Sequence, residues 1–215
     1  MRLRVPLPLL ALVLAAAPAA AQEDDAYAAM LARFQAGDST VDARELRMTY
    51  TRTSHYDPYG TDGMDDTRAM MQALNAGRHE EAAQAAERVL AHNWLDITAH
   101  MAAAFAYEEM GADSAAALHQ VAAHRLLESI GTEKDGRSER APMRVIEISE
   151  EYAWLRAHGL RPAGQGLADC GPVRCDAMQV VDENGERFTV YFDVNTPYEW
   201  MAKRMGGGNE EDERP

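Results

Sequence analysis

Two histidine–carboxylate pairs at helical spacing are the residues of this sequence best suited to chemistry. Asp96 lies four residues before His100, and Glu128 lies four residues after His124. Residues four apart share one face of an α-helix. If the two helices are antiparallel, His100 lies opposite His124, and Asp96 lies opposite Glu128. Two imidazoles and two carboxylates at one level could bind a divalent metal such as zinc, or each carboxylate could orient a histidine as a general base.

The alternative is that the same four side chains form a satisfied polar layer, or separate groups that face solvent. The choice depends on a rotation of each helix that the sequence does not fix. The chain has no His-Glu-x-x-His motif and no Gly-x-Ser-x-Gly motif. We therefore assign no catalytic residue from the sequence. We expect no cofactor, with a divalent metal as the alternative.

A second candidate site is a segment rich in tyrosine, arginine, proline and glycine. The segment 51–63 has too little apolar content for regular structure. Five side chains in and before it could line a pocket: Arg47, Tyr50, Arg52, Tyr56 and Tyr59. The alternative is a loop whose rings only pin it to the neighbouring helices.

The chain has two cysteines, Cys170 and Cys175, which are separated by Gly-Pro-Val-Arg. In an oxidising compartment such a short spacing is best explained by a disulfide. A metal knuckle would need further ligands nearby, and a redox centre would favour Cys-x-x-Cys, which is absent from the sequence.

The element that must position the histidines is an Ala-rich helical run between Met64 and Ile130. Gly77 and Gly111 lie 34 residues apart, and each is followed by an alanine five residues later. This period is that of tetratricopeptide repeats, in which small residues let antiparallel helices approach closely. The pattern predicts four helices at 64–76, 79–91, 94–110 and 113–130, preceded by helices at 25–36 and 41–50.

The last third of the chain changes to strand patterns. Residues 143–148 predict a strand, 149–158 a capped helix, and 177–181 with 187–192 a hairpin around Asn184-Gly185. A Gly/Pro loop carries the cysteines. The predicted fold class is α+β, with about two tetratricopeptide-like antiparallel helical hairpins followed by a small antiparallel β-sheet.

The N-terminus has the composition of a secretory signal peptide. Residues 1–21 contain two arginines, a short apolar run and Ala19-Ala-Ala21. Cleavage near Ala21 would give a periplasmic or secreted protein and would change the net charge from −14 to −16, because Arg2 and Arg4 are lost. Such an acidic surface argues against binding to nucleic acid, and no later segment is apolar enough for membrane insertion.

We expect three segments: the signal peptide 1–21, a single α+β domain at 22–204, and a disordered acidic tail at 205–215. Within the domain, we place the helical part at 25–130 and the strand–helix–hairpin part at 142–194.

Several stretches together resemble a family of exported bacterial proteins known only as a domain of unknown function. These stretches are Leu46–Tyr50 with Tyr56–Tyr59, Asp96–His100, Asp135–Ser138, Val145-Ile146 running into Glu150–Tyr152, Gly159-Leu160, and Tyr191–Asp193. The resemblance implies export and an α+β fold. It supplies no activity, substrate or catalytic residue.

The sequence favours a non-enzymatic module that binds a protein or peptide, because helical hairpins of this spacing commonly present grooves to peptides. The alternative is a metal-dependent hydrolytic enzyme that uses the inter-helix histidine–carboxylate cluster.

Overall fold

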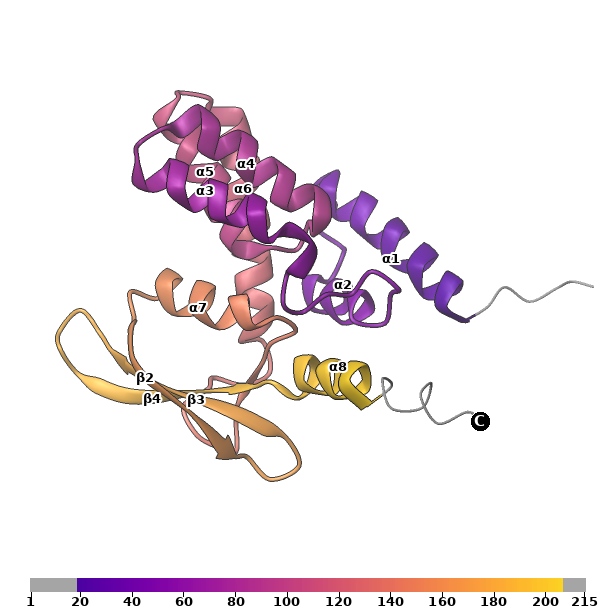
Figure 1. Ribbon diagram of the computed structural model, residues 1–215, viewed down its shortest axis with the longest axis vertical. Coiled ribbons are helices and arrows are strands. Elements are labelled where there is room, and N and C mark those ends of the chain that lie inside the picture. The colour runs from indigo at the N-terminus through magenta and orange to yellow at the C-terminus, as the bar shows by residue number, and fades with distance from the viewer. Residues whose placement is uncertain (1–18, 207–215) are drawn as a thin grey trace, which may run out of the picture.

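The computed structural model describes residues 19–206 (Figure 1). Most of the predicted signal peptide (residues 1–18) and most of the predicted tail (residues 207–215) lie outside this range. The first half of the described chain is helical. Its elements are α1 (Ala19–Gln35), α2 (Ala43–Tyr50), the 3-10 turn η1 (Thr61–Gly63), α3 (Met64–Asn75), α4 (His79–His92), α5 (Ile97–Glu109) and α6 (Asp113–Ile130).

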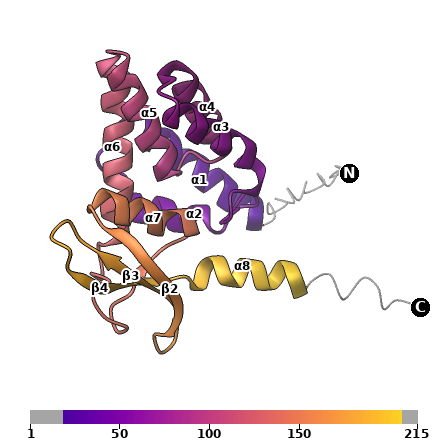
Figure 2. The same ribbon diagram turned by 60° about the vertical axis from the view of Figure 1, so that its left-hand side comes forward.

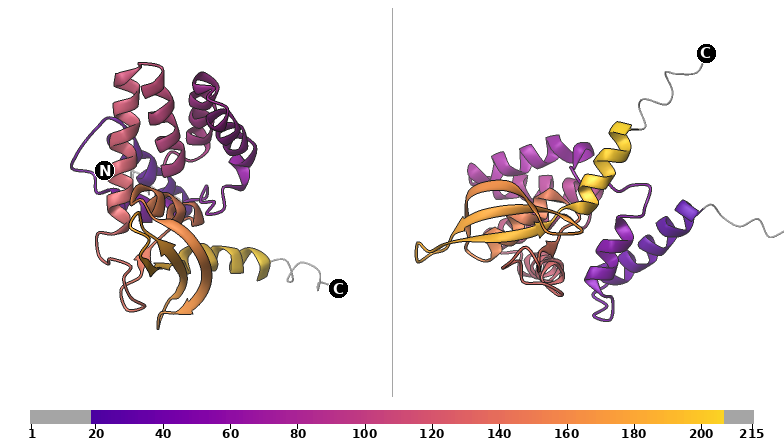
Figure 3. Two further views of the ribbon diagram at one scale, coloured as in Figure 1. Left: turned by 90° about the vertical axis from the view of Figure 1, so that its left-hand side faces the viewer. Right: turned by 90° about the horizontal axis from the view of Figure 1, so that it is seen from below.

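Helices α3 to α6 form two hairpins that pack side by side at one end of the molecule (Figures 1 and 3). The hairpin turns need glycine, because Gly77 and Gly111 have left-handed backbones with φ of +66° and +70°. Small side chains fill the contacts between the helices, among them Ala82, Ala86, Ala99, Ala103 and Ala106, each at most 2% exposed. The four predicted helices are confirmed, although α5 begins three residues later than predicted, because Asp96 caps it.

The second half of the chain forms a four-stranded sheet and two helices. The strands are β1 (Met143–Arg144), β2 (Arg161–Asp169), β3 (Arg174–Val181) and β4 (Arg187–Asp193), and the helices are α7 (Ile148–Ala157) and α8 (Asn195–Gly206). The sheet order is β1-β4-β3-β2. Helix α7 lies between the sheet and the helical hairpins, and α8 follows β4 and extends away from the sheet (Figures 1 and 2).

The α+β fold class is confirmed, with one correction to the sheet. Strands β2, β3 and β4 are antiparallel, but β1 is parallel to β4, with Met143 opposite Phe192. The sheet is therefore mixed and not antiparallel as predicted. The strand predicted at 143–148 ends at Arg144, because the chain turns there to begin α7 at Ile148.

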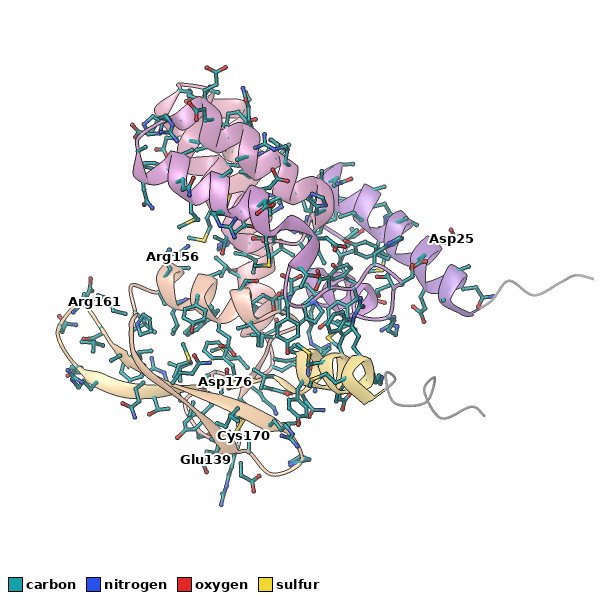
Figure 4. All side chains as sticks on the ribbon, viewed as in Figure 1. Asp25, Glu139, Arg156, Arg161, Cys170 and Asp176 are labelled. Atoms are coloured by element: carbon teal, nitrogen blue, oxygen red, sulfur yellow. A yellow bond between two sulfur atoms is a disulfide. The ribbon has the colours of Figure 1, made fainter. Side chains whose placement is uncertain are left out.

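Two elements were not predicted. Strand β2 occupies part of the predicted Gly/Pro loop, and α8 follows the last predicted strand. The disulfide prediction is confirmed, since Cys170 and Cys175 are bonded across the end of the β2–β3 hairpin (Cys170 is labelled in Figure 4). Within residues 19–206, no helix is both long and apolar enough to cross a membrane.

One glycine in the loop before β1 is required by close packing. Gly136 has φ of +67°, and an added Cβ would lie 2.6 Å from Met143 Cε and 3.2 Å from the Tyr191 carbonyl oxygen. The Gly136 backbone also pairs with β4, because the amide of Tyr191 donates to the Gly136 carbonyl. The segment Asp135–Ser138 therefore has a structural explanation, because it pairs with β4 next to the two-residue strand β1.

Candidate functional site

A groove of about 1,260 Å³ lies where the helical hairpins, the tyrosine-rich loop, the start of α7 and α8 meet. Its size exceeds that of a single side chain and suits a peptide or a sizeable small molecule. Five groups of lining residues come from segments far apart in the sequence: Tyr27 with Tyr50, residues 54–64, residues 89–94 with Asp96, residues 147–149, and Trp200 with Arg204.

A chain of aromatic rings forms one wall of the groove. The ring of Tyr50 lies 5.2 Å from that of Tyr27 and 5.4 Å from that of Tyr56, measured between centroids. Trp200 of α8 extends this row of rings, with its centroid 6.5 Å from that of Tyr56 and 5.9 Å from that of Tyr59. These separations are those of favourable edge-to-face and tilted aromatic pairs. The wall therefore ties α1, α2, the loop and α8 together.

The tyrosine-rich loop is held by the carboxylate of Asp57. The Asp57 Oδ2 atom accepts hydrogen bonds from the Thr61 amide and hydroxyl, each 2.6 Å long, and Oδ1 accepts one from the Tyr59 amide. The buried hydroxyl of Tyr56 donates to the Ile146 carbonyl just before α7. The loop lacks regular structure, yet its backbone is fixed by side-chain hydrogen bonds of the kind that aspartate commonly makes in turns.

The floor of the groove carries two carboxylic acids. Asp96 begins α5, where its Oδ1 atom accepts a 2.8 Å hydrogen bond from the Ala99 amide. Glu147 precedes α7 and is only 5% exposed. Its two oxygens accept hydrogen bonds from Asn93 Nδ2 and from Ser149 Oγ. Both donors are neutral, so Glu147 is hydrogen-bonded but has no cation beside it among the described residues.

The electrostatics of the floor follow from this arrangement. Burial raises the pKa of Glu147 well above its usual value, and the nearby Glu150 and Asp96 carboxylates raise it further. Burial likewise raises the pKa of Asp96. The pKa values of the Tyr27, Tyr50 and Tyr56 hydroxyls are also raised, first by burial and then by the Glu147 charge. The groove therefore disfavours additional negative charge.

Comparison with known proteins identifies the chain's family. Residues 20–203 match the family described as a domain of unknown function, DUF4919. The chain belongs to this family. No curated protein and no solved structure matches it. The DUF4919 domain spans α1 and most of α8, so every part of the groove lining except Arg204 lies within it.

The structure brings together some of the pocket residues predicted in the DUF4919 domain. Tyr50, Tyr56 and Tyr59 line the groove. Arg52 instead lies on the surface, where it pairs with Glu23 at 3.0 Å. Arg47 is 2% exposed and does not line the groove.

Arg47 forms a buried ion pair with Glu150 in the first turn of α7. Its Nε and Nη2 atoms donate to the two Glu150 carboxylate oxygens at 2.8 and 2.5 Å, and Nη1 donates to Ser129 Oγ. The amide of Ile146 donates to the same carboxylate at 2.7 Å. This bidentate pair ties α2 and α6 to α7 and has a structural role.

The four residues of the predicted metal cluster do not meet. Asp96 lies on the groove floor, while His100 is buried and its Nδ1 atom lies 2.9 Å from Nδ1 of His119. His124 and Glu128 form a pair at 3.3 Å on the exposed face of α6, with side chains 70% and 67% exposed. No three His, Cys, Asp or Glu side chains within residues 19–206 are grouped so that they could hold a metal ion.

The His100–His119 pair is a satisfied polar contact inside the helical hairpins. His100 Nε2 lies 2.8 Å from the Trp94 carbonyl, which can only accept, so this nitrogen carries the proton. Burial lowers the pKa of His100 to about 4, which keeps the ring neutral. Its Nδ1 atom therefore accepts from His119, and His119 Nε2 lies 3.1 Å from Glu87 Oε1.

Several further residues that line the groove are not predicted from the sequence: Glu147, Asn93, Ser149, Trp94 and Trp200. One signal could have located Glu147. In the run Met143–Ile148 it falls on the same alternate positions as Met143 and Val145, so a carboxylate occupies an otherwise apolar face. A buried charge without an obvious partner is expensive, which makes such a position a candidate site.

Proposed function

We propose that this protein is an exported, non-enzymatic module that binds a segment of a polypeptide in the groove between its helical hairpins and α8. Export is supported by the signal-peptide pattern of residues 1–21 and is compatible with the Cys170–Cys175 disulfide. The groove itself is the observation that carries the binding function.

Three properties of the groove suit a peptide. Its volume of about 1,260 Å³ accommodates several side chains. Its aromatic wall offers flat apolar surface at low conformational cost, since the rings already pack on one another. Its floor offers polar atoms, from Asn93, Asp96, Glu147 and Ser149, to orient a bound chain.

A peptide-display selection against the chain lacking residues 1–21 tests this function. We expect enriched peptides whose affinity falls at least tenfold in Trp200→Ala, because Trp200 is half-buried in the wall and lies on the terminal helix. The matched control is Leu118→Ala, which removes a large side chain that is 51% exposed on α6 and does not line the groove.

Equal binding to the wild type and to Trp200→Ala would contradict the proposal, and so would a selection that enriches no peptide. Circular dichroism and a thermal melt of each variant show whether a loss of binding reflects loss of the fold.

A further inference from the structure

The two acids on the groove floor, Glu147 and Asp96, have no neutralising partner and line a cavity that a ligand can enter. Among residues 19–206, neither Glu147 nor Asp96 has a lysine, arginine or histidine nitrogen within 4.0 Å. By contrast, Glu150 is paired with Arg47, and the 3% exposed Asp193 is paired with Arg144 at 3.2 Å. The floor is therefore an anionic site without its counter-charge.

The basic groups of the groove lie at its exposed rim. Arg68 is bonded to Asp65 at 2.7 Å, and His92 lies 3.5 Å from Asp66. His55 is exposed. Arg204 is also exposed, with its guanidinium carbon 4.8 Å from the centre of the Trp200 ring. None of these cations reaches the floor, so the floor stays open to a cation from a ligand.

The aromatic wall suits the same ligand. The face of a tryptophan or tyrosine ring attracts an ammonium or guanidinium group, most strongly where water is excluded. The protein already uses this interaction, since Arg204 lies over Trp200 at the mouth of the groove. The methylene groups of a lysine or arginine also pack on apolar surface while the charged end reaches a polar site.

We propose that the groove recognises a lysine or arginine side chain of its peptide partner, with the cation held by the Glu147 and Asp96 carboxylates and the stem packed on the aromatic wall. This inference rests on the proposed peptide-binding function. A lysine or arginine residue matches a site that combines a buried anionic floor, an aromatic wall and room for flanking residues.

Binding of this kind is coupled to a proton. Burial raises the pKa of Glu147, so ionisation of its carboxyl group is disfavoured in the free protein. A bound cation favours the carboxylate and lowers this pKa, so affinity rises with pH through the titration of Glu147. Other titratable groups face Glu147 or the groove: Asp96 at the start of α5, Glu150 with Arg47, Tyr27, Tyr50, Tyr56, and the rim histidines His55 and His92.

The test uses four acetylated and amidated heptapeptides, Gly-Ala-Tyr-X-Ala-Ala-Gly, in which X is lysine, arginine, norleucine or glutamate. Binding to the chain lacking residues 1–21 is measured by titration calorimetry and by tryptophan fluorescence at pH 5.5 and pH 8. We expect the lysine and arginine peptides to bind at least tenfold tighter than the norleucine peptide at pH 8, and the glutamate peptide to bind most weakly.

The decisive variant is Glu147→Gln, which retains an oxygen to accept from Asn93 and removes the charge. We expect its preference for lysine over norleucine to fall below threefold, and its affinity for lysine to lose the rise between pH 5.5 and pH 8. Since the rim histidines remain in this variant, the loss identifies Glu147 as the titrating group. Asp96→Asn, which can still cap α5, is the second variant and should weaken lysine binding with the fold intact.

The outcomes separate this inference from the proposed function. If the norleucine peptide binds as tightly as the lysine peptide, and Trp200→Ala weakens both, the groove binds peptides but the cation preference is wrong. If Glu147→Gln and Asp96→Asn both keep the lysine preference, the cation site is also wrong. If no heptapeptide binds, this inference is overturned, whereas the proposed function falls only if the display selection also fails.

Discussion

Two glutamates three residues apart near the start of α7 show how differently a buried carboxylate can be used. Glu150 accepts both arms of the Arg47 guanidinium and the Ile146 amide. Glu147 accepts only from the neutral Asn93 and Ser149, and it opens onto the groove. Both side chains are at most 5% exposed. Burial alone therefore does not distinguish a structural acid from a candidate site, whereas its partners and its access to a cavity do.

A third buried acid, in the first turn of α7, separates the effect of partners from that of access to the groove. Glu151 is fully buried, and neither of its carboxylate oxygens has a hydrogen-bond partner among the described residues. Burial raises its pKa to about 8, and the Asp176 carboxylate of β3 (labelled in Figure 4) contributes to the shift. Glu151 does not line the groove. A missing partner thus points to a site only where a ligand can reach the acid.

The largest effect is expected from breaking the structural pair. The variant Arg47→Met leaves the charge of Glu150 buried without a partner. We expect this change to lower the free energy of unfolding by about 3–5 kcal/mol. Chemical denaturation measures the loss.

The control for this prediction is the double variant Arg47→Met/Glu150→Gln. It removes both charges and keeps an acceptor for the Ile146 amide, so it should recover most of the lost stability. If the free energy of unfolding of Arg47→Met stays within about 1 kcal/mol of the wild-type value, Glu150 does not need Arg47 to neutralise its charge. The proposed difference between Glu150 and Glu147 would then be wrong.

The next largest effect is expected at Glu151, where a substitution should stabilise the protein and not destabilise it. Its pKa is about 8 in the folded chain, against an ordinary value of 4.5. Because the folded state binds the proton more tightly, this residue makes the protein less stable as pH rises through that window, by about 1.4 kcal/mol per pH unit. Glu151→Gln removes this loss, so we expect it to raise the free energy of unfolding by about 3 kcal/mol at pH 7 and by little below pH 4.5.

Denaturation curves from pH 4 to pH 8 check this expectation. Glu183→Gln, in the exposed turn between β3 and β4, is the matched control and should keep the wild-type pH profile. A Glu151→Gln variant with that same profile would show that Glu151 is ionised in the folded protein.

The helical half of the fold could be predicted because its pattern is local. The period between Gly77 and Gly111 and the alanines after them set the hairpins, and the structure places the ends of α3 to α6 within three residues of the prediction. Helix α1, which lies outside this period, begins at Ala19, six residues before its predicted start. Strand β2 could not be predicted, because almost all of its residues are exposed and it contains Gly164 and Gly166, so no apolar alternation marks it. Pairing with β3 defines it instead.

The site was only partly predictable for a similar reason. The tyrosines of the loop signal a pocket through their composition. The groove floor, however, joins Asn93 and Asp96 to Glu147, about fifty residues later in the chain, and its wall needs Trp200 of α8. Arg47 was assigned to the pocket because it lies near the tyrosines in sequence, but its partner Glu150 lies 103 residues away. Contacts at such separations depend on how the helices pack, which no local pattern determines.

The smallest effects should come from the histidines, where the same comparison of buried and exposed partners applies. His119→Ala leaves Nδ1 of the buried His100 without a donor, which should lower the free energy of unfolding by about 1–3 kcal/mol. His124→Ala breaks only the exposed pair with Glu128, so we expect a change within about 0.5 kcal/mol. Both variants remove one imidazole from α6, so each serves as the control for the other in urea denaturation at pH 7. If both variants lose the same free energy of unfolding, burial of the partner does not set the size of the effect. The comparison between buried and exposed histidine contacts would then be wrong.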